Sequence, residues 1–201
     1  MLGLMGLRIA LAAALLMAAP LPSVSAEEGV SAAIGRANYA GFRDRRHCTA
    51  FAVGPRTVIT AAHCIDGLGG AMTILFGYDR GEWQAEAVTV SAKDVGQDVA
   101  VLCLGRDSPA SLTIAADGAG PGAATQLVGY GKPRVHAQQR RDCPVMAPVG
   151  GDLLLRCPAS PGFSGGPLLN TDGEVVGVMS RTGRGTSYAA DVAGLTADCP
   201  G

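Results

Sequence analysis

Residues 162–167 read Gly-Phe-Ser-Gly-Gly-Pro and place one serine, Ser164, between glycines. Because glycine has no Cβ, the backbone around Ser164 can turn sharply, and another molecule can approach it closely. A hydroxyl on such a turn can be presented to a substrate, with neighbouring backbone N–H groups free to bind an oxyanion. A serine alone is a weak nucleophile and needs a nearby base. The stretch therefore predicts a nucleophilic site if the chain also supplies a base and an orienting acid.

The Gly-x-Ser-x-Gly pattern also fits the nucleophile elbow of α/β-hydrolases, in which an acid and then a histidine follow the serine. All three histidines, His47, His63 and His136, precede Ser164. No histidine is left for that order, whereas the order histidine, acid, serine stays open. An α/β-hydrolase esterase is further disfavoured because no segment keeps a helical period over three turns.

Short strand-like runs dominate the 201-residue chain, which has 29 glycines and few aromatic residues. Runs such as residues 57–60 (Thr-Val-Ile-Thr) and 99–104 alternate with Gly, Asp and Pro turns. Many short strands at regular spacing favour an all-β barrel or sandwich. We expect a first barrel at about 38–105, a linker at about 106–123, a second barrel at about 124–193 and a tail at 194–201.

Residues 1–26 have the features of a secretory signal peptide. An apolar run at residues 9–19 precedes small residues that suit cleavage after Ala26. The run is short for a membrane anchor and is interrupted by Pro20 and Pro22. We therefore expect a secreted or periplasmic protein that is not attached to a membrane after cleavage. The following residues, 27–38, are small and polar and are interpreted as a short pro-segment or a loose N-terminus.

All six cysteines lie in the exported part of the chain: Cys48, Cys64, Cys103, Cys143, Cys157 and Cys199. An even number of cysteines after a signal peptide suggests three disulfides in an oxidising compartment, although their connectivity stays open. The lack of a C-x-x-C spacing and of a ligand-spaced histidine pair argues against a metal site. The net charge of −1 gives no reason to expect nucleic acid as a partner.

Three blocks occur in one order along the chain: residues 60–64 (TAAHC), 97–102 (QDVAVL) and 162–167 (GFSGGP). Together they resemble the signature blocks of the trypsin/chymotrypsin family, and the resemblance covers essentially residues 27–201. It implies two six-stranded antiparallel Greek-key β-barrels with the active site in the cleft between them. It also implies a serine endopeptidase that cleaves polypeptides through an acyl-enzyme intermediate, as a monomer without a cofactor.

In this family, the histidine, the aspartate and the serine of these blocks form a catalytic triad. The resemblance assigns the nucleophile to Ser164, the general base to His63 and the orienting acid to Asp98. It assigns the oxyanion hole to the backbone N–H groups of Gly162 and Ser164. Taken singly, His63 also fits a histidine of the core, Asp98 a capping or turn residue, and Gly162 a turn glycine. The three motifs together outweigh these structural interpretations.

Substrate contacts are assigned to residues downstream and upstream of the nucleophile. Ser180 stands where the family has a serine beside the buried aspartate, and with Arg181 and Thr182 it forms the edge expected to pair with an extended substrate. Many relatives have an aromatic residue where this chain has Arg181. The base of the S1 pocket falls at Pro158, six residues before the serine, so a preference for Arg or Lys is not supported.

The resemblance also pairs Cys48 with Cys64, the family bridge beside the histidine. Cys143 and Cys157 flank the approach to the nucleophile and are expected to pair, which leaves Cys103 with Cys199. The alternative is that one of these cysteines is buried and free.

Phe163 departs from the animal digestive branch, which has an aspartate there that pairs with the N-terminus released on activation. Phenylalanine cannot form that ion pair. We therefore expect an enzyme that does not mature by insertion of its N-terminus, as in the compact bacterial branch.

A catalytically silent peptide-binding protein of the same fold is the alternative function. The presence of all three triad residues disfavours it, because silent members usually lack one of them.

Overall fold

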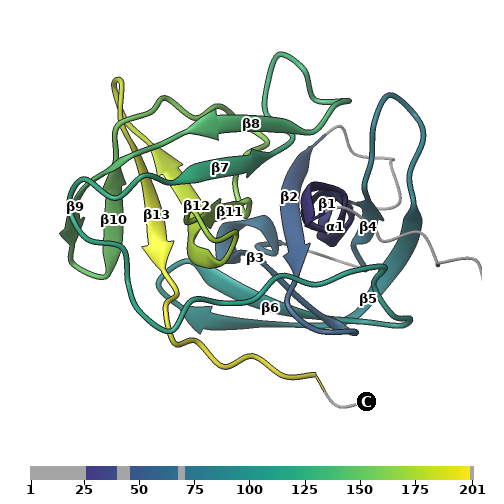
Figure 1. The fold of residues 1–201 in the computed structure, drawn as a ribbon. Helices are drawn as coiled ribbons and strands as arrows, with labels where there is room; N and C mark the ends of the chain where they lie inside the picture. The colour runs from purple at the N-terminus through teal and green to yellow at the C-terminus, as the bar shows by residue number, and fades with distance from the viewer. Residues whose placement is uncertain (1–25, 40–45, 68–70, 200–201) are drawn as a thin grey trace, which may run out of the picture.

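The computed structural model describes residues 26–39, 46–67 and 71–199. The predicted signal peptide lies outside these residues, except for Ala26 at its end. Strands make up most of the regular structure, and α1 (Ala26–Ala33) is the one α-helix of the described residues. Figure 1 shows two curled sheets side by side. No helix in the described ranges is long and apolar enough to cross a membrane.

The first sheet is a closed antiparallel barrel with the strand order β1-β2-β3-β6-β5-β4 (Figure 1). Its strands are β1 (Ile34–Asn38), β2 (His47–Ala52), β3 (Thr57–Ala61), β4 (Thr73–Phe76), β5 (Ala85–Gly96) and β6 (Val99–Leu104). β1, β2 and β3 are successive neighbours, and β4 returns to pair with β1, which is a Greek key. β3 is buried at every position, as expected for its β-branched sequence in a barrel wall.

The second sheet has the order β8-β7-β11-β12-β13-β10-β9. Its strands are β7 (Gln126–Gly129), β8 (Gln139–Asp142), β9 (Val145–Val149), β10 (Asp152–Leu155), β11 (Pro167–Leu169), β12 (Val175–Thr182) and β13 (Ser187–Asp191). β11 pairs with β7 on one side and with β12 on the other. The all-β prediction is therefore confirmed, with seven strands in the second half where the resemblance implies six.

The seventh strand arises because one strand is bent. Only Cys143 and Pro144 separate β8 from β9, and these two strands form opposite ends of the sheet order. The Cys143 N–H donates to Thr125 O at 2.8 Å and the Val145 N–H to Ala123 O at 3.0 Å, so pairing continues across the bend. The sheet thus curls back on itself. Counting β8 and β9 as one strand gives the same Greek-key order as in the first barrel.

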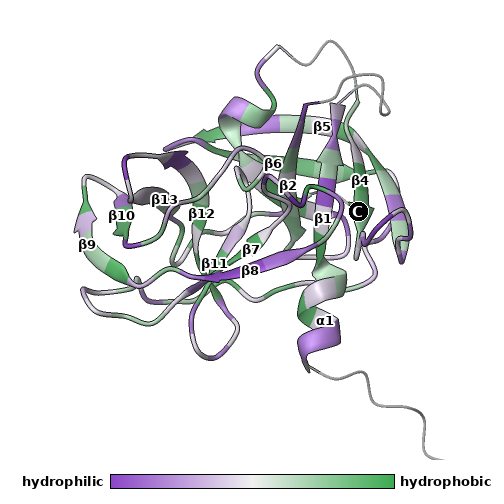
Figure 2. Ribbon diagram, turned by 90° about the horizontal axis from the view of Figure 1, so that it is seen from above, coloured by the Kyte–Doolittle hydropathy of each residue, from purple (hydrophilic) through white to green (hydrophobic). Residues whose placement is uncertain are grey.

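The segment at residues 27–38 corrects the sequence analysis, which interpreted it as a pro-segment or a loose N-terminus. It forms α1 and β1, and β1 lies between β2 and β4 in the closed barrel. Ile34 is fully buried, and a Cβ on Gly35 would lie 2.5 Å from Ile74 Cγ2. Small residues are required here by close strand packing, which is why the segment lacks a strong hydrophobic pattern. Figure 2 shows the hydrophilic start of α1 and its apolar end toward β1.

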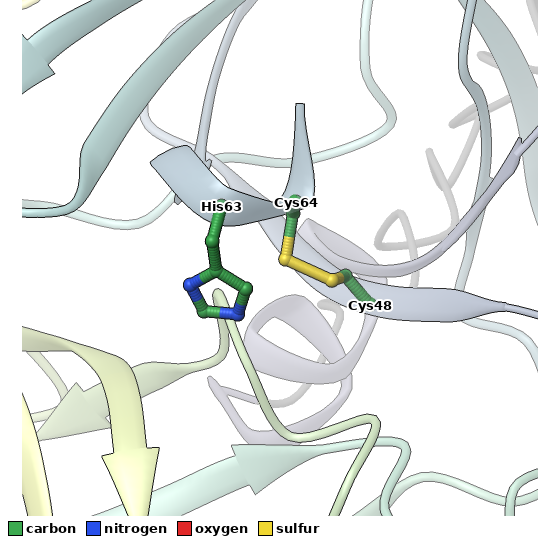
Figure 3. A group of neighbouring side chains, drawn as sticks. All are labelled: Cys48, His63 and Cys64. Atoms are coloured by element: carbon green, nitrogen blue, oxygen red, sulfur yellow. A yellow bond between two sulfur atoms is a disulfide. The ribbon is translucent and has the colours of Figure 1, made fainter. Parts of the chain in front are cut away.

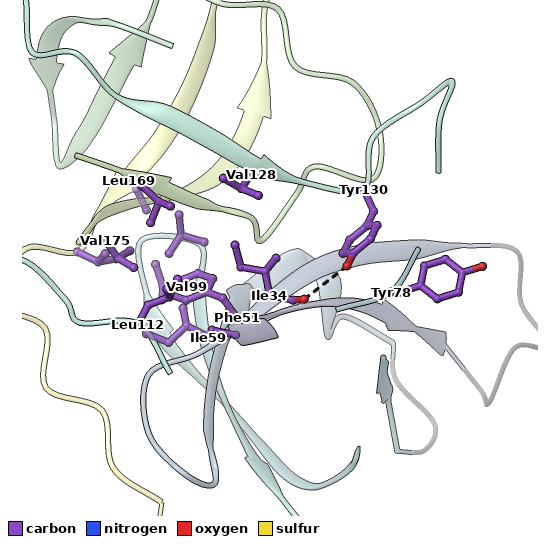
Figure 4. Close-up of a cluster of buried hydrophobic side chains, with 14 of the residues drawn as sticks. Ile34, Phe51, Ile59, Tyr78, Val99, Leu112, Val128, Tyr130, Leu169 and Val175 are labelled. Atoms are coloured by element: carbon purple, nitrogen blue, oxygen red, sulfur yellow. Dashed lines mark hydrogen bonds between the residues drawn. The ribbon is translucent and has the colours of Figure 1, made fainter. Parts of the chain in front are cut away.

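A shared hydrophobic core lies between the two sheets (Figure 4). Its members come from both barrels and from the linker: Ile34, Phe51, Ile59 and Val99 from the first, Val128, Leu169 and Val175 from the second, and Leu112 from the linker. Tyr130 is also fully buried there, and its hydroxyl donates to Ile34 O at 3.4 Å. Because the halves share one core, the residues that each contributes near the other are held in a defined relation.

Three disulfides join Cys48 to Cys64, Cys103 to Cys199, and Cys143 to Cys157. These are the three pairs expected from the sequence, of which the family resemblance implies the first. The second bridge returns the C-terminal tail to the first barrel, where the Cys199 N–H also donates to Thr57 Oγ1 at 3.1 Å. Figure 1 shows this tail passing below β6.

Candidate active site

His63 lies on a short 3-10 helix, η2 (Ala62–Cys64), which directly follows β3. The buried β3 and the disulfide from Cys64 to Cys48 hold this turn from both sides, and the imidazole itself is 43% exposed. The His63 backbone N–H donates to Asp98 Oδ1 at 2.9 Å, and the preceding Ala62 N–H donates to Asp98 O at 2.9 Å. The turn that carries the histidine is therefore fastened directly to the turn that carries the aspartate.

Asp98 lies in the tight turn between β5 and β6. Both Gln97 and Asp98 have left-handed backbone angles, with φ of 51° and 58°. This conformation is uncommon for residues other than glycine and concentrates at functional sites. Both carboxylate oxygens lie within hydrogen-bond distance of His63 Nδ1, at 3.0 and 2.9 Å. Ser180 Oγ donates to Asp98 Oδ2 at 2.5 Å, so the carboxylate is held from both barrels.

The environment of Asp98 favours its ionised form. Partial burial raises the pKa of the carboxyl, but the hydrogen bonds from Ser180 and from the His63 backbone and ring outweigh it. The net pKa lies below the ordinary value. An ionised carboxylate accepts a hydrogen bond from Nδ1–H, which leaves Nε2 unprotonated in the neutral ring and able to accept a proton.

Ser164 lies in the turn before β11, half-buried between two left-handed glycines, Gly162 (φ 104°) and Gly165 (φ 79°). This turn rests on the first barrel. A Cβ on Gly165 would lie 2.1 Å from Thr60 Oγ1 and 2.9 Å from Ala61 N, two residues before the histidine. No side chain fits there, and the absence of one lets the serine turn approach the turn that carries His63.

The backbone N–H groups at the serine turn are of two kinds. Phe163 N–H donates to Ser160 O at 3.1 Å and Gly165 N–H to Met179 O at 2.7 Å, so both point inward. Within the described residues, the N–H groups of Gly162 and Ser164 donate to no protein acceptor. Two free donors on one left-handed turn match the arrangement of an oxyanion hole.

Phe163 is fully buried beneath the serine turn. Its ring packs so closely on Gly131 that a Cβ there would lie 2.0 Å from Phe163 Cδ2. The guanidinium of Arg141 covers the ring at 4.8 Å and donates to Pro158 O at 2.8 Å. An apolar plug with a cationic cap therefore stands where an ion pair with a new N-terminus would require a carboxylate.

His63 and Ser164 lie on neighbouring turns. Among the described contacts, no hydrogen bond joins the His63 ring to the Ser164 hydroxyl. Catalytic hydrogen bonds are often long without substrate and shorten when substrate binds. The two side chains thus come from adjacent turns on facing barrels, with the aspartate already engaged.

The end of β12 offers an open edge beside this site. β11 pairs with β12 only as far as Val178, whereas β13 stays paired to Thr182. Arg181 and Thr182 thus have no strand on their other side in the described part of the chain, which suits pairing with an extended peptide. The Arg181 side chain turns to Asp152, 2.5 Å away, and covers the Tyr188 ring at 4.4 Å. Pro158 is exposed at the surface.

One group near the site has the composition of a metal centre. Ligand atoms of Cys48, His63 and Cys64 lie within 4.8 Å of one another (Figure 3). The two sulfur atoms are bonded to each other, so neither is the thiolate that zinc requires. This group therefore does not fit a metal ion.

Two residues at the site have no signal in the sequence motifs. Thr49 binds the serine turn from β2, and only its position as the polar residue among the otherwise apolar residues 48–52 distinguishes it. Asp152 reaches Arg181 from β10 across 29 residues, and no local pattern predicts that ion pair.

Comparison with known proteins agrees with this geometry. The sequence model of the trypsin-like peptidase domain matches residues 48–178. No curated protein sequence gives a significant match. Among solved structures, a Glu endopeptidase is similar with a TM-score of 0.70 and 16% identity, over 82% of this chain and 87% of that chain. The active form of the Rv3671c protease from M. tuberculosis has a TM-score of 0.68 and 23% identity, over 85% of this chain and 84% of that chain. The family match spans more than half of the chain and includes His63, Asp98 and Ser164, so this protein belongs to the trypsin-like peptidases.

Proposed function

We propose that the chain is an exported serine endopeptidase that hydrolyses peptide bonds with a triad of Ser164, His63 and Asp98. The observation that carries this proposal is the set of hydrogen bonds that orients the His63 imidazole through Asp98. Both Asp98 oxygens face His63 Nδ1, while Ser180 and the His63 backbone N–H bind the same carboxylate. A core histidine needs no such arrangement, whereas a general base does, because its tautomer must be set.

The reaction follows from these roles. Ser164 Oγ attacks the carbonyl carbon of the scissile bond, and His63 Nε2 takes the hydroxyl proton. The C–N bond then breaks, the amine leaves with that proton, and an acyl-enzyme ester remains on Ser164. Water, deprotonated by the same imidazole, cleaves the ester and restores the hydroxyl. Asp98 stays ionised throughout and stabilises the imidazolium.

The oxyanion of each tetrahedral intermediate is bound by the N–H groups of Gly162 and Ser164, which have no acceptor in the described structure. The peptide lies along the open edge at Ser180, Arg181 and Thr182 and forms main-chain hydrogen bonds there. Pro158 borders the S1 region. Asp152 forms an ion pair with Arg181 and neutralises its charge. The planar guanidinium thus lines the substrate edge where many relatives have an aromatic ring.

Export is supported by two features of the chain. Residues 1–26 have the composition of a cleavable signal peptide. All six cysteines are joined in disulfides, which persist in oxidising compartments. We therefore infer that the protein acts outside the cytoplasm on polypeptide substrates. The family resemblance leads us to expect a monomer without a cofactor.

The decisive experiment compares the wild type with Ser164→Ala and with Ser111→Ala, which changes an exposed serine in the linker. A fluorophosphonate probe is expected to label the wild type and Ser111→Ala, but not Ser164→Ala. Peptide-library cleavage should fall by at least about 10³-fold in Ser164→Ala alone. Labelling of Ser164→Ala would contradict the assignment of the nucleophile. A wild type that binds peptides but neither labels nor cleaves would support the silent binding protein.

A further inference from the structure

Thr49 is a fully buried residue of the first barrel whose side chain serves the second barrel. Its hydroxyl donates to Gly162 O at 2.8 Å and accepts from the Tyr130 N–H at 3.0 Å. Both partners lie in loops of the second barrel, one of them in the serine turn. The hydroxyl therefore joins two loops of the second barrel, which are also linked by the bonds from the Lys132 N–H to Pro161 O and from Ser160 Oγ to Lys132 O.

The backbone of Thr49 adds a second hold on the same turn. Its N–H donates to Ser164 O at 2.8 Å, and its own carbonyl accepts from Thr60 Oγ1 at 2.8 Å. One residue thus binds the carbonyls of both Gly162 and Ser164, on either side of Phe163. Thr60 fixes Thr49 from the next strand.

Fixing these carbonyls also fixes the adjoining peptide planes, because each peptide unit is planar. The plane that holds Gly162 O also holds the Phe163 N–H, which is directed to Ser160 O. The Gly162 N–H lies in the preceding plane, whose Pro161 O accepts from the Lys132 N–H at 3.0 Å. The two planes meet at Gly162, so the bonds to Thr49 and to Lys132 together set its left-handed angle. The Ser164 N–H likewise lies between the two planes that Thr49 binds, in a plane whose Phe163 O accepts from the Gly166 N–H. The orientation of the predicted oxyanion hole therefore depends in part on a hydroxyl in the opposite barrel.

We propose that Thr49 is a positioning residue for the oxyanion hole, an inference that rests on the proposed peptidase function. Thr49 follows Cys48, which is bonded to Cys64 beside the general base. The same short piece of β2 thus positions both the histidine turn and the serine turn. Thr49 touches neither substrate nor the reacting atoms, and it acts through Gly162 and Ser164.

The test compares Thr49→Val, which keeps the shape but removes the hydroxyl, with Thr49→Ser, which keeps the hydroxyl. Thr89→Val is the matched control, because Thr89 is also buried in the first barrel. Among the described residues its hydroxyl binds only the Met72 N–H, away from the serine turn. For Thr49→Val we expect kcat to fall about 10²-fold with KM nearly unchanged, since small misplacements of catalytic groups have effects of this size. Thr49→Ser should keep kcat within about threefold of the wild type, as should Thr89→Val.

Amide hydrogen exchange gives a second readout that does not require activity. Thr49→Val should speed exchange at Phe163 and Gly165 by about tenfold or more, whereas Thr89→Val should not. If Thr49→Val does not fold, Thr49→Ala takes its place in both measurements. An unchanged kcat with unchanged exchange in the hydroxyl-free variants, or an equal loss in Thr49→Ser, would overturn the proposal. An inactive wild type would refute the peptidase function, while the exchange data would still decide whether Thr49 holds the turn.

Discussion

The hydroxyl of Ser180 donates a 2.5 Å hydrogen bond to Oδ2 of Asp98, although 82 residues separate them in the chain. The bond crosses from β12 of the second barrel to the turn between β5 and β6 of the first. It is one of the contacts that hold the pKa of the Asp98 carboxyl below its ordinary value. The orientation of the Asp98 carboxylate is thus set by both halves of the fold.

Ser180→Ala should lower the free energy of unfolding by about 1–2 kcal/mol at neutral pH, since the bond is to a charged but partly exposed group. A carboxyl with a lowered pKa in the folded state stabilises the protein above its ordinary pKa and loses that effect as the pH falls through the folded pKa. The difference between wild type and variant should therefore be largest near pH 7 and shrink as the pH falls below about 4. Urea unfolding at several pH values measures it.

Ser187→Ala is the control for this pH dependence. Ser187 is buried on the neighbouring β13, and its hydroxyl binds only the backbone groups of Cys157 and Ala159. The decrease in the free energy of unfolding caused by Ser187→Ala should be the same at every acidic pH tested. A Ser180→Ala deficit that does not change with pH would argue against ionised Asp98 as the partner that matters.

Gly131→Ala should displace Phe163, because the new methyl group would lie 2.0 Å from Cδ2 and 2.1 Å from Cε2 of its ring. Overpacking of this kind costs about 1–3 kcal/mol of stability. Because Phe163 anchors the serine turn, kcat/KM should also fall about 10²-fold. Gly120→Ala is the control, since nothing lies within 4 Å of its Cβ position. Full activity in Gly131→Ala would show that the plug does not position the turn.

A blocked N-terminus should leave activity intact, because a buried phenylalanine cannot pair with an α-amino group. An N-terminal tag on the mature chain, or Glu27→Pro in the first turn of α1, should change kcat/KM by no more than about threefold. Ile34→Ala in β1 should by contrast lower stability by about 2–5 kcal/mol. A large loss of activity with the tag would instead support maturation by insertion of the N-terminus.

Removal of the bridge between Cys103 and Cys199 should destabilise the protein more than removal of the bridge between Cys143 and Cys157. The sequence separations are 96 and 14 residues. In the chain-entropy account, a loop of the longer kind is worth about 4–5 kcal/mol and one of the shorter kind about 3 kcal/mol. Denaturant unfolding of the two Cys→Ala double variants under oxidising conditions compares them. Equal losses would mean that packing, and not loop closure, dominates.

Much of the architecture could be predicted because its signals are local. A β-branched run of a few residues predicts the strand β3. The glycines around Ser164 likewise predict a tight turn from the local sequence alone. Two strands carried no such signal. β1 is built from small residues that allow close packing, and β8 reads Gln-Arg-Arg-Asp, without an apolar alternation. Both segments are strands because neighbouring strands of the sheet supply their hydrogen-bond partners. Those partners are distant in the chain, so the local sequence does not reveal them.

The sequence by itself determined the class of this protein: an all-β chain of the trypsin-like peptidase family, with a histidine, an aspartate and a serine in the order of that family's motifs. Only the tertiary structure decided how those groups are held. Thr49 grips the serine turn across the barrels, Ser180 binds Asp98, and β8 and β9 close the second sheet as one bent strand. The reason is physical: residue types set which bonds can form, whereas contacts between distant segments exist only once the two barrels share a core.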